Sequence, residues 1–195
     1  MQLVLASRNA HKLRELDALL APHDVVPLSE DVELPPETGE TFEHNASVKA
    51  EAAARATGRP SVADDSGIAA AALGGRPGVR SARYAGEHAS DEENLEKLIH
   101  DVPRDGDRRV AYVCVLVFAT PAGDRHAVEG RCEGTLAEEP RGSGGFGYDP
   151  AFIPDDYPGD RTMAELSPEE KDAISHRGRA ARELVAWLGE REAAA

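Results

Sequence analysis

Residues 110–120 read VAYVCVLVFAT, and after the turn Pro121-Ala122-Gly123 residues 125–135 read RHAVEGRCEGT. Both runs contain the apolar and β-branched residues that are typical of strands, and the turn between them contains glycine. Two strand-like runs joined by a short turn of this kind predict a long antiparallel hairpin. The arrangement of the rest of the chain is worked out around this hairpin.

Short strands and amphipathic helices are expected on either side of it. We expect strands over residues 2–6, 25–28 and 61–63, the last broken by the polar run Asp64-Asp65-Ser66-Gly67. We expect helices over residues 10–20, 41–56 and 90–99, a helix opened by Ser167-Pro168, and a final helix. Because βα units are combined with a hairpin, the fold class predicted is α/β, with a mixed sheet flanked by helices.

Local signals place the ends of several of these elements. Ser90 with Glu93 and Ser167 with Glu170 have the capping-box spacing that begins a helix. Glycine-rich stretches at residues 74–78 and 142–147 indicate loops, and the tail Glu192–Ala195 is expected to be frayed. Apolar residues expected to face the core recur with helical spacing, namely Leu13, Leu16, Leu19, Leu20, Ala180, Leu184 and Leu188.

The length of 195 residues predicts one domain, spanning residues 1–195, with room for two lobes. The formal net charge of −14 excludes the basic surface that a binder of nucleic-acid polymers or anionic membranes needs. The apolar stretch Met1–Ala6 is too short for a signal sequence or a membrane span. Cys114 and Cys132 are expected to be half-buried thiols in a reducing compartment. We therefore expect a cytoplasmic protein.

The first candidate site is the loop between the first strand and the first helix. It reads Ser7-Arg8-Asn9-Ala10-His11-Lys12. A helix N-terminus with unpaired amide hydrogens and a nearby lysine is a site for an anion such as phosphate. The local sequence fits a plain helix cap as well, because Ser and Asn are ordinary capping residues.

Acidic residues mark two further segments. The first, Glu37-Thr38-Gly39-Glu40-Thr41, precedes a helix that carries Lys49, and it also fits simple capping. The second, Asp64-Asp65-Ser66-Gly67, follows an apolar strand, where ligand sites of such folds gather, but it also fits an Asp-rich turn. Because successive strand side chains point to opposite faces, we expect one aspartate to face a metal and the other to brace the loop.

The last two candidate segments lie in the C-terminal half. Gly144-Gly145-Phe146-Gly147-Tyr148-Asp149-Pro150 places two aromatic rings among glycines, which suits stacking on a base or a plain glycine-rich turn. Residues 170–177 read EKDAISHR and supply Lys171, His176 and Arg177 as donors close to one apolar residue, Ile174. No single segment decides the function.

Together these segments resemble the inosine triphosphate pyrophosphatase family, also called the XTP/dITP diphosphatases. The matching motifs, spread over nearly the whole chain in the family's order, are SRNAHK at 7–12, ETGETFEHNASVKA at 37–50, ADDSGI at 63–68, GRPGVRSARYAG at 75–86, GGFGYDPAF at 144–152 and EEKDAISHRGRA at 169–180. The resemblance implies an elongated, twisted mixed β-sheet flanked by helices, with two lobes and the active cleft between them. It also implies a homodimer.

The resemblance further implies roles for individual residues. Glu37 and Asp65 are similar to the family's Mg²⁺ ligands, and Asp65 resembles its proton acceptor. The substrate-binding residues implied are Ser7, Arg8, Asn9, Ala10, His11, Lys12, Lys49, Ser66, Phe146, Gly147, Tyr148, Asp149, Lys171, His176 and Arg177. The segment from Ser7 to Lys12 and Lys49 would hold the triphosphate. The residues from Phe146 on would hold the base and sugar.

Two positions depart from the family's pattern. His44 stands where Glu is usual, which removes a capping-box partner for Thr41, and Ser7 stands where Thr is common. The function expected is Mg²⁺-dependent hydrolysis of ITP, dITP and XTP to the monophosphate and pyrophosphate. Two alternatives stay open: a Maf-type pyrophosphatase acting on pyrimidine or methylated nucleotides, and a nucleotide-binding regulatory protein without turnover.

Overall fold

The computed structural model describes residues 1–193, and its strands form one six-stranded sheet in the order β2-β1-β3-β4-β5-β6. The strands are β1 Gln2–Leu5, β2 Asp24–Pro27, β3 Ser61–Ala70, β4 Arg109–Ala119, β5 Arg125–Leu136 and β6 Phe152–Pro154. β1 runs parallel to β2 and β3, whereas β5 and β6 are antiparallel. The sheet is therefore mixed, as expected.

Five α-helices accompany the sheet. They are α1 Ala10–Leu19, α2 Phe42–Thr57, α3 Asp91–Asp101, α4 Pro168–Ile174 and α5 His176–Ala193. The capping boxes predicted at Ser90 and Ser167 are both present. Residues 192 and 193 end α5 rather than fraying, and 194–195, the rest of the predicted frayed tail, lie outside the described residues.

The chain divides into two compact units. The first unit consists of Met1–Asp65, Cys114–Gly130 and the chain from Arg177 on, and the second consists of Ser66–Val113 and Arg131–His176. The sequence predicts one domain with two lobes. How the two lobes are arranged relative to each other stays a prediction.

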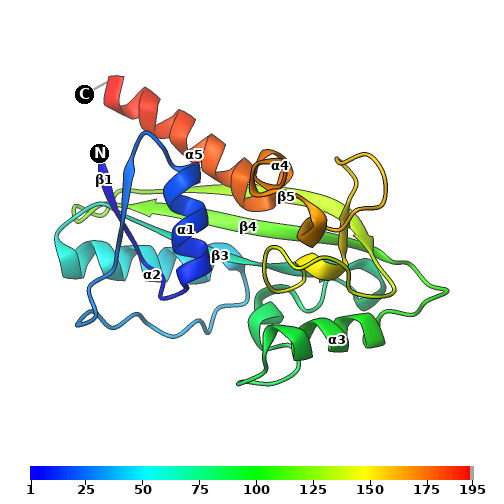
Figure 1. Ribbon diagram of the computed structural model, residues 1–195. Helices are drawn as coiled ribbons and strands as arrows, with labels where there is room; N and C mark the ends of the chain where they lie inside the picture. The colour runs from blue at the N-terminus through cyan, green and yellow to red at the C-terminus, as the bar shows by residue number, and fades with distance from the viewer. Residues whose placement is uncertain (194–195) are drawn as a thin grey trace. The chain divides into compact units, whose positions relative to one another are not determined.

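In the first unit, helices cover both faces of the strands. Leu3 and Leu5 of β1 pack with Leu16 of α1 and Leu184 of α5, whereas Val4 packs with the alanines of α2. The alternation follows from the two-residue period of a strand. Figure 1 shows α5 and α2 on opposite sides of these strands.

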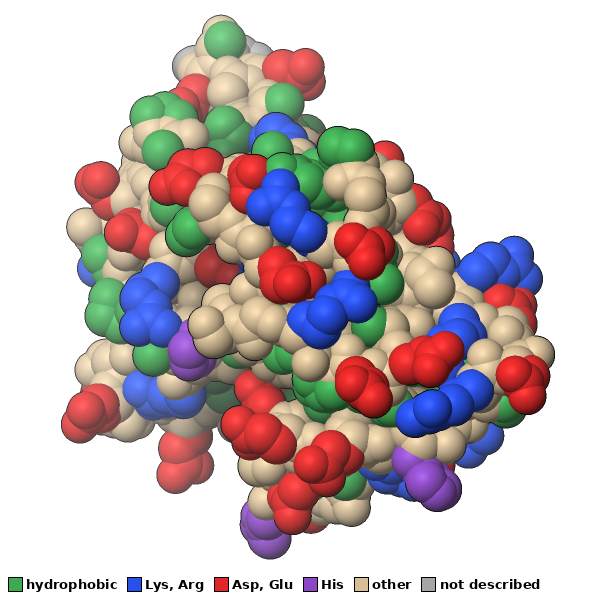
Figure 2. Space-filling view, turned by 45° about the vertical axis from the view of Figure 1, so that its right-hand side comes forward, with side chains coloured by type: hydrophobic (Ala, Val, Ile, Leu, Met, Phe, Trp, Pro, Cys, Tyr) green, Lys and Arg blue, Asp and Glu red, His purple; other side chains and the backbone are tan. Residues whose placement is uncertain are grey.

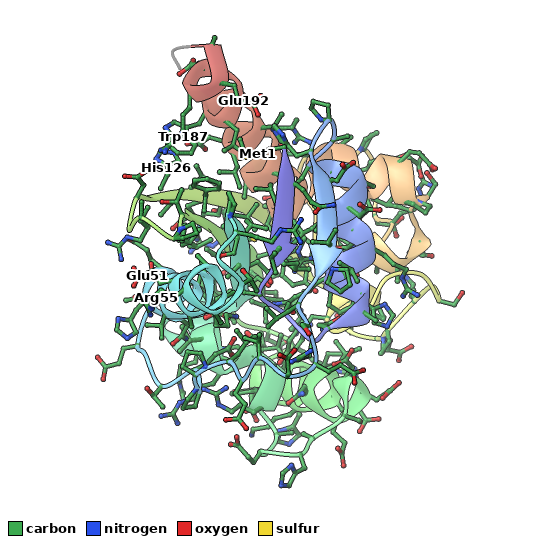
Figure 3. All side chains as sticks on the ribbon, turned by 90° about the vertical axis from the view of Figure 1, so that its left-hand side faces the viewer. Met1, Glu51, Arg55, His126, Trp187 and Glu192 are labelled. Carbon is green, nitrogen blue, oxygen red and sulfur yellow. The ribbon has the colours of Figure 1, made fainter. Side chains whose placement is uncertain are left out.

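The exposed side of the first unit carries local pairs. The rings of His126 in β5 and Trp187 in α5 are stacked with centroids 4.0 Å apart, and Figure 3 shows them side by side. On α2, Arg55 and Glu51 form an exposed ion pair one helical turn apart at 3.5 Å. Such exposed pairs contribute little to stability.

The second unit has a core of its own, formed by the second half of β3, the parts of β4 and β5 that belong to this unit, α3 and the loops around β6. Its largest buried side chains include Ile68, Leu98, Leu136, Phe152 and Met163.

On the face drawn in Figure 2, acidic and basic side chains are interspersed. This mixed distribution fits the acidic composition.

The polar run after the third strand was predicted wrongly. β3 continues through Asp64, Asp65, Ser66 and Gly67 to Ala70 instead of breaking there. The strand persists because its polar side chains find partners inside the protein. Gly67 fits because any Cβ there would collide with the carbonyl of Gly78 and the hydroxyl of Ser81. The cysteines are also more buried than expected, since Cys114 and Cys132 are both fully buried in β4 and β5.

Candidate active site

Asp64 is the centre of a charged cluster on the face of β3 that packs against α1 and α5. Its side chain is completely buried. Oδ1 lies 2.8 Å from Lys12 Nζ, and Oδ2 accepts hydrogen bonds from Nε and Nη2 of Arg177 at 3.2 and 3.0 Å. Burial alone would raise the pKa of Asp64, but the positive charges of Lys12 and Arg177 outweigh it and hold this pKa well below its usual range. Asp64 is therefore a permanent anion that fixes two cations.

Arg177 joins this cluster to α1. Its side chain is 2% exposed, and its second terminal nitrogen, Nη1, forms an ion pair with Glu15. The sequence led us to expect Arg177 in the base and sugar pocket. The partners of its guanidinium include two carboxylates of the first unit, Asp64 and Glu15, and its contact with a base or sugar stays a prediction. A buried guanidinium with two carboxylate partners is held in one orientation.

Asp65 points to the opposite face, toward α2, as the strand alternation predicts. Its Oδ2 accepts a hydrogen bond from Nδ2 of Asn45 at 2.9 Å. Burial raises the pKa of Asp65, the Asn45 bond lowers it, and the negative charge of Glu37 raises it again, with a net value of about 6. A carboxylate with this pKa can accept a proton near neutral pH.

Glu37 and Lys49 complete the group on this face. The side chain of Glu37 is 33% exposed and forms an ion pair with Lys49, whose Nζ also donates to the backbone carbonyl of Asp64 at 2.7 Å. Burial would lower the pKa of Lys49, but the charges of Asp64 and Glu37 outweigh it and raise this pKa. Lys49 stays charged and ties the Glu37 loop to β3.

The residues of this group fit a hard divalent cation. Burial is the main cause of the raised pKa of Asp65, and the negative charge of Glu37 adds to it. A cation bound between the two carboxylates would relieve their repulsion. Within residues 1–193 no group of three or more His, Cys, Asp or Glu side chains is placed to hold a metal. Mg²⁺ does not need one, because it is commonly bound by one or two carboxylates together with substrate phosphates and water.

The loop from Ser7 to Lys12 forms the N-terminus of α1, and its capping is fully developed. Oδ1 of Asn9 accepts the amide hydrogens of His11 and Lys12 at 2.8 and 3.2 Å, and Oγ of Ser7 accepts that of Asn9 at 3.2 Å. The expectation of unpaired amides is therefore wrong for the amides of Asn9, His11 and Lys12. A phosphate would have to replace the side-chain oxygens that act as caps.

The other side chains of this loop have their own partners. Arg8 donates to the backbone carbonyls of Leu28, Ser29, Glu30 and Val32, at 2.8 to 3.3 Å, and so clamps the loop after β2. His11 lies 2.9 Å from Arg14 on the exposed side of α1. Ala10 begins the helix. Lys12 is the residue of this loop whose side chain reaches the charged cluster.

In the second unit, Asp149 organises a loop with an aromatic ring and a lysine. Its Oδ2 accepts hydrogen bonds from Lys171 Nζ at 2.8 Å and from the amide of Phe146 at 2.9 Å. The Lys171 ammonium lies 5.2 Å from the centroid of the Phe146 ring. Gly145 has a φ of +69°, and any Cβ there would collide with the Asp149 carboxylate. Gly145 thus lets the backbone approach the Asp149 carboxylate closely, and a close approach to a ligand stays a prediction.

The two aromatic rings of this loop differ in exposure. Tyr148 is buried, and its hydroxyl donates to the carbonyl of Ser81 at 2.7 Å, whereas Phe146 is half-buried. Phe146 is therefore the ring that is better placed to stack on a ligand. Gly147 donates its amide to Asp91 at 3.0 Å, and Ser66 is half-buried in β3.

His176 is held by a residue that the sequence did not single out. Its ring is stacked on that of Tyr112, with centroids 4.5 Å apart and planes 6° from parallel. The Tyr112 hydroxyl donates to Oδ1 of Asp149 at 3.2 Å. Tyr112 thus links His176 to the Asp149–Lys171 pair.

Sequence reasoning also missed Asn45 and Glu15 as members of these groups. Asn45 is part of the family motif at 37–50, but nothing in the local sequence indicates that its side chain contacts Asp65. Glu15 lies in α1, and nothing in its local pattern distinguishes it from an ordinary exposed acid.

Within residues 1–193, no helix is long and apolar enough to cross a bilayer.

Comparison with known proteins agrees with the motifs and the geometry. Residues 3–187 match the Ham1 family. A protein of Cutibacterium acnes named dITP/XTP pyrophosphatase is 49% identical over 193 residues, covering 94% of each chain. One of Geobacillus kaustophilus with the same name is 48% identical over 194 residues, covering 94% of this chain and 92% of that protein.

A solved structure of a HAM1 protein from Coxiella burnetii has the same fold. It superposes with a TM-score of 0.88 at 43% sequence identity, covering 97% of this chain and 99% of that one. The match of the family over almost the whole chain, together with these relatives, settles the classification: this chain is a member of the Ham1 family.

Proposed function

We propose that this protein hydrolyses the non-standard purine nucleotides ITP, dITP and XTP to the monophosphate and pyrophosphate. The observation that carries the proposal is the arrangement of charge on the two faces of β3. Glu37 and Asp65 lie on one face with the buried cation Lys49. On the other face, Asp64 binds Lys12 and the buried Arg177. Phosphoryl chemistry requires positioned charge and an oriented water rather than a covalent nucleophile. The names of the curated relatives agree with this reaction.

In this proposal, Asp65 takes the proton from the water that attacks the α-phosphorus. Its pKa of about 6 suits a base that must be ionised at neutral pH and still accept a proton. Lys12 and Lys49 attract the phosphate oxygens. Asp64 forms ion pairs with Lys12 and Arg177 and so holds both side chains in place.

Glu37 and Asp65 are the residues that we propose to hold Mg²⁺. When bound, Mg²⁺ neutralises phosphate oxygens and so lowers the charge repulsion that a nucleophile meets. The ion pair between Lys49 and Glu37 keeps the Glu37 side chain close to β3.

We assign recognition of the base to the second unit. Hypoxanthine and xanthine carry an acceptor oxygen at position 6, whereas adenine carries a donor amino group. Lys171 and His176 can offer donors, and Phe146 offers a ring for stacking. A donor that faces the adenine amino group would lose its hydrogen bond, which costs about 1–3 kcal/mol.

Pyrophosphate release over a panel of eight nucleotides, with Mg²⁺ and with EDTA, tests this proposal. ITP, dITP and XTP should be cleaved much faster than ATP and GTP, and only with Mg²⁺. Faster cleavage of pyrimidine or methylated nucleotides would favour the Maf-type alternative. Tight nucleotide binding without any pyrophosphate release would favour a regulatory role.

We further propose a cytoplasmic homodimer. Two buried cysteines that form no disulfide, Cys114 and Cys132, suit a reducing compartment. The dimer rests on the family resemblance alone. Light scattering coupled to size-exclusion chromatography checks it, and a mass near 20.8 kDa at all concentrations would contradict it.

A further inference from the structure

Asn45 lies at a position in α2 where its own helix does not need it. The helix begins at Phe42, and Thr41 caps it by accepting the amide hydrogen of His44 at 3.2 Å. Asparagine is a weaker helix former than alanine in a helix interior. Asn45 is nevertheless 2% exposed. A buried asparagine that the helix does not require is kept there by its partners outside the helix.

Those partners are the two segments that carry the carboxylates. Oδ1 of Asn45 accepts the amide hydrogen of Gly39, two residues after Glu37, at 2.8 Å. Nδ2 donates to Oδ2 of Asp65 at 2.9 Å. One planar amide therefore connects the Glu37 loop to the Asp65 carboxylate, and it fixes the rotation of that carboxylate as well.

Gly39 and Lys49 support the same arrangement. A Cβ on Gly39 would collide with the ring of His44 and with Oδ1 of Asn45, so the loop approaches α2 as closely as it can. Lys49 lies one turn beyond Asn45 and binds Glu37 and the carbonyl of Asp64. One face of α2 thus makes two contacts with each segment, because Asn45 and Lys49 each bind both the Glu37 loop and β3.

We propose that Asn45 is the positioning residue that sets the spacing between the Glu37 loop and Asp65 for a divalent cation. The inference rests on the proposed function in taking Glu37 and Asp65 as the metal ligands. Groups that orient metal ligands by hydrogen bonding commonly contribute 10- to 100-fold to metal affinity or activity.

The second unit contains a matched control. Asn94 occupies the same position in α3, is also 2% exposed, accepts the amide hydrogen of Ala85 at 2.8 Å and donates to the carbonyl of Ala82 at 3.2 Å. The two asparagines differ in the partner that Nδ2 binds. Nδ2 of Asn45 donates to the Asp65 carboxylate, with a longer contact of 3.5 Å to the carbonyl of Gly39, whereas Nδ2 of Asn94 donates to a backbone carbonyl. Asn94→Ala and Asn45→Ala should therefore destabilise the fold by similar amounts.

The experiment measures Mn²⁺ binding to the purified protein from the paramagnetic resonance signal of the unbound ion, and the Mg²⁺ concentration that gives half-maximal pyrophosphate release. Asn45→Ala should weaken Mn²⁺ binding and raise the Mg²⁺ requirement by about 10-fold or more. Asn94→Ala should change neither by more than about twofold. Equal effects of the two substitutions, or none from Asn45→Ala, would overturn the proposal.

A second pair of variants approaches the loop from its other side. Gly39→Ala keeps the Asn45 amide, but its Cβ would collide with the His44 ring and with Oδ1 of Asn45, so the loop must move away from α2 and Mn²⁺ binding should weaken. Gly189→Ala is the control, because a Cβ there meets nothing within 4 Å. Unchanged Mn²⁺ binding in Gly39→Ala would contradict the role of loop spacing, even if Asn45→Ala failed to fold.

The two proposals fail in different ways. If the wild-type protein released no pyrophosphate from any nucleotide, the proposed function would fail, and the Mn²⁺ comparison would still decide the role of Asn45. If the wild-type protein bound no Mn²⁺ with or without nucleotide, the positioning role would be wrong.

Discussion

The two units of the molecule hold buried charge in different ways. In the first unit, the carboxylates outnumber the cations in the two groups around β3. The groups involved are Glu15, Glu37, Asp64 and Asp65 on one side and Lys12, Lys49 and Arg177 on the other. In the second unit, one carboxylate, Asp149, meets one ammonium, Lys171, and two neutral donors.

This difference separates two tasks. A group with excess negative charge is completed by a cation, and its lysines then remain available to a polyanion. A neutral pair beside the Phe146 ring suits an uncharged ligand with donors and acceptors, such as a purine base. We therefore expect substitutions in the first unit to change turnover for all nucleotides, and substitutions in the second to change the choice among them.

The largest effect is expected on stability, from Arg177→Ala. This change leaves Asp64 buried without the guanidinium that donates twice to its Oδ2, which should destabilise the protein by about 3–5 kcal/mol. Arg109→Ala removes an exposed ion pair and should change stability by no more than about 0.5 kcal/mol. Urea unfolding of both variants measures the difference. If Arg177→Ala folds, it should slow the cleavage of ITP and of ATP by similar factors, as expected of a substitution in the first unit.

Asp65→Asn should lower turnover by about 100-fold or more and leave nucleotide binding intact, because it keeps the size of the side chain and removes the base. The same change should not lower the melting temperature of the metal-free protein at pH 8, since burial and Glu37 disfavour the charged form of Asp65. Single-turnover rates and calorimetric binding give the two readouts. Retention of more than about a tenth of the wild-type rate would exclude Asp65 as the base.

A lysine in each unit tests the division of tasks directly. Lys49→Met should lower kcat/KM for ITP and ATP by the same factor. Lys171→Met should narrow the ITP-to-ATP ratio by about 10-fold, which corresponds to one lost hydrogen bond of about 1.4 kcal/mol. The proposed division of tasks would be wrong if Lys49→Met changed the ITP-to-ATP ratio of kcat/KM and Lys171→Met left it unchanged.

Acid stability should depend on a carboxylate of the second unit that lies outside both groups. Hydrogen bonds from Lys97 and Tyr84 hold the pKa of Asp101 well below its usual range. Because the folded pKa is depressed, the stabilisation is present above about pH 4, the ordinary value for Asp, and is lost as the pH falls further. Asp101→Asn should lower stability by about 1 kcal/mol at pH 7, and the difference from wild type should shrink below pH 4.

Most elements of the fold follow from apolar periodicity and capping signals. The hairpin, the two capping boxes and the inward face of α5 are where the sequence predicts them. The predicted break of the third strand at Asp64 was wrong. Local propensity opposes a strand there, but contacts from Lys12, Arg177 and Asn45, in distant parts of the chain, stabilise the strand.

The candidate site shows the same contrast between features that local sequence predicts and features that depend on distant contacts. The motifs identify Asp65, Glu37 and Lys49, which the structure brings to one face of β3 and α2. Asn45, Tyr112 and Glu15 act through contacts with residues far away in the sequence, so their roles depend on the fold and give no local signal.

The smallest effect concerns His44, which stands where the family usually has Glu. Thr41 caps α2 through the amide of His44, but the reciprocal side-chain bond of a capping box is absent from this helix, in contrast to α3 and α4. His44→Glu should supply that bond and add a favourable charge near the helix N-terminus, for a gain of about 0.5–1 kcal/mol. The exposed histidine ring lies against Gly39, so the flexible Glu side chain must fit the same space without moving the loop. A melting temperature that rises by a few degrees with an unchanged Mg²⁺ requirement would show that the two roles of this helix N-terminus are separable. A fall in melting temperature would mean that the ring itself supports the Glu37 loop, and the Mg²⁺ requirement should then rise with it.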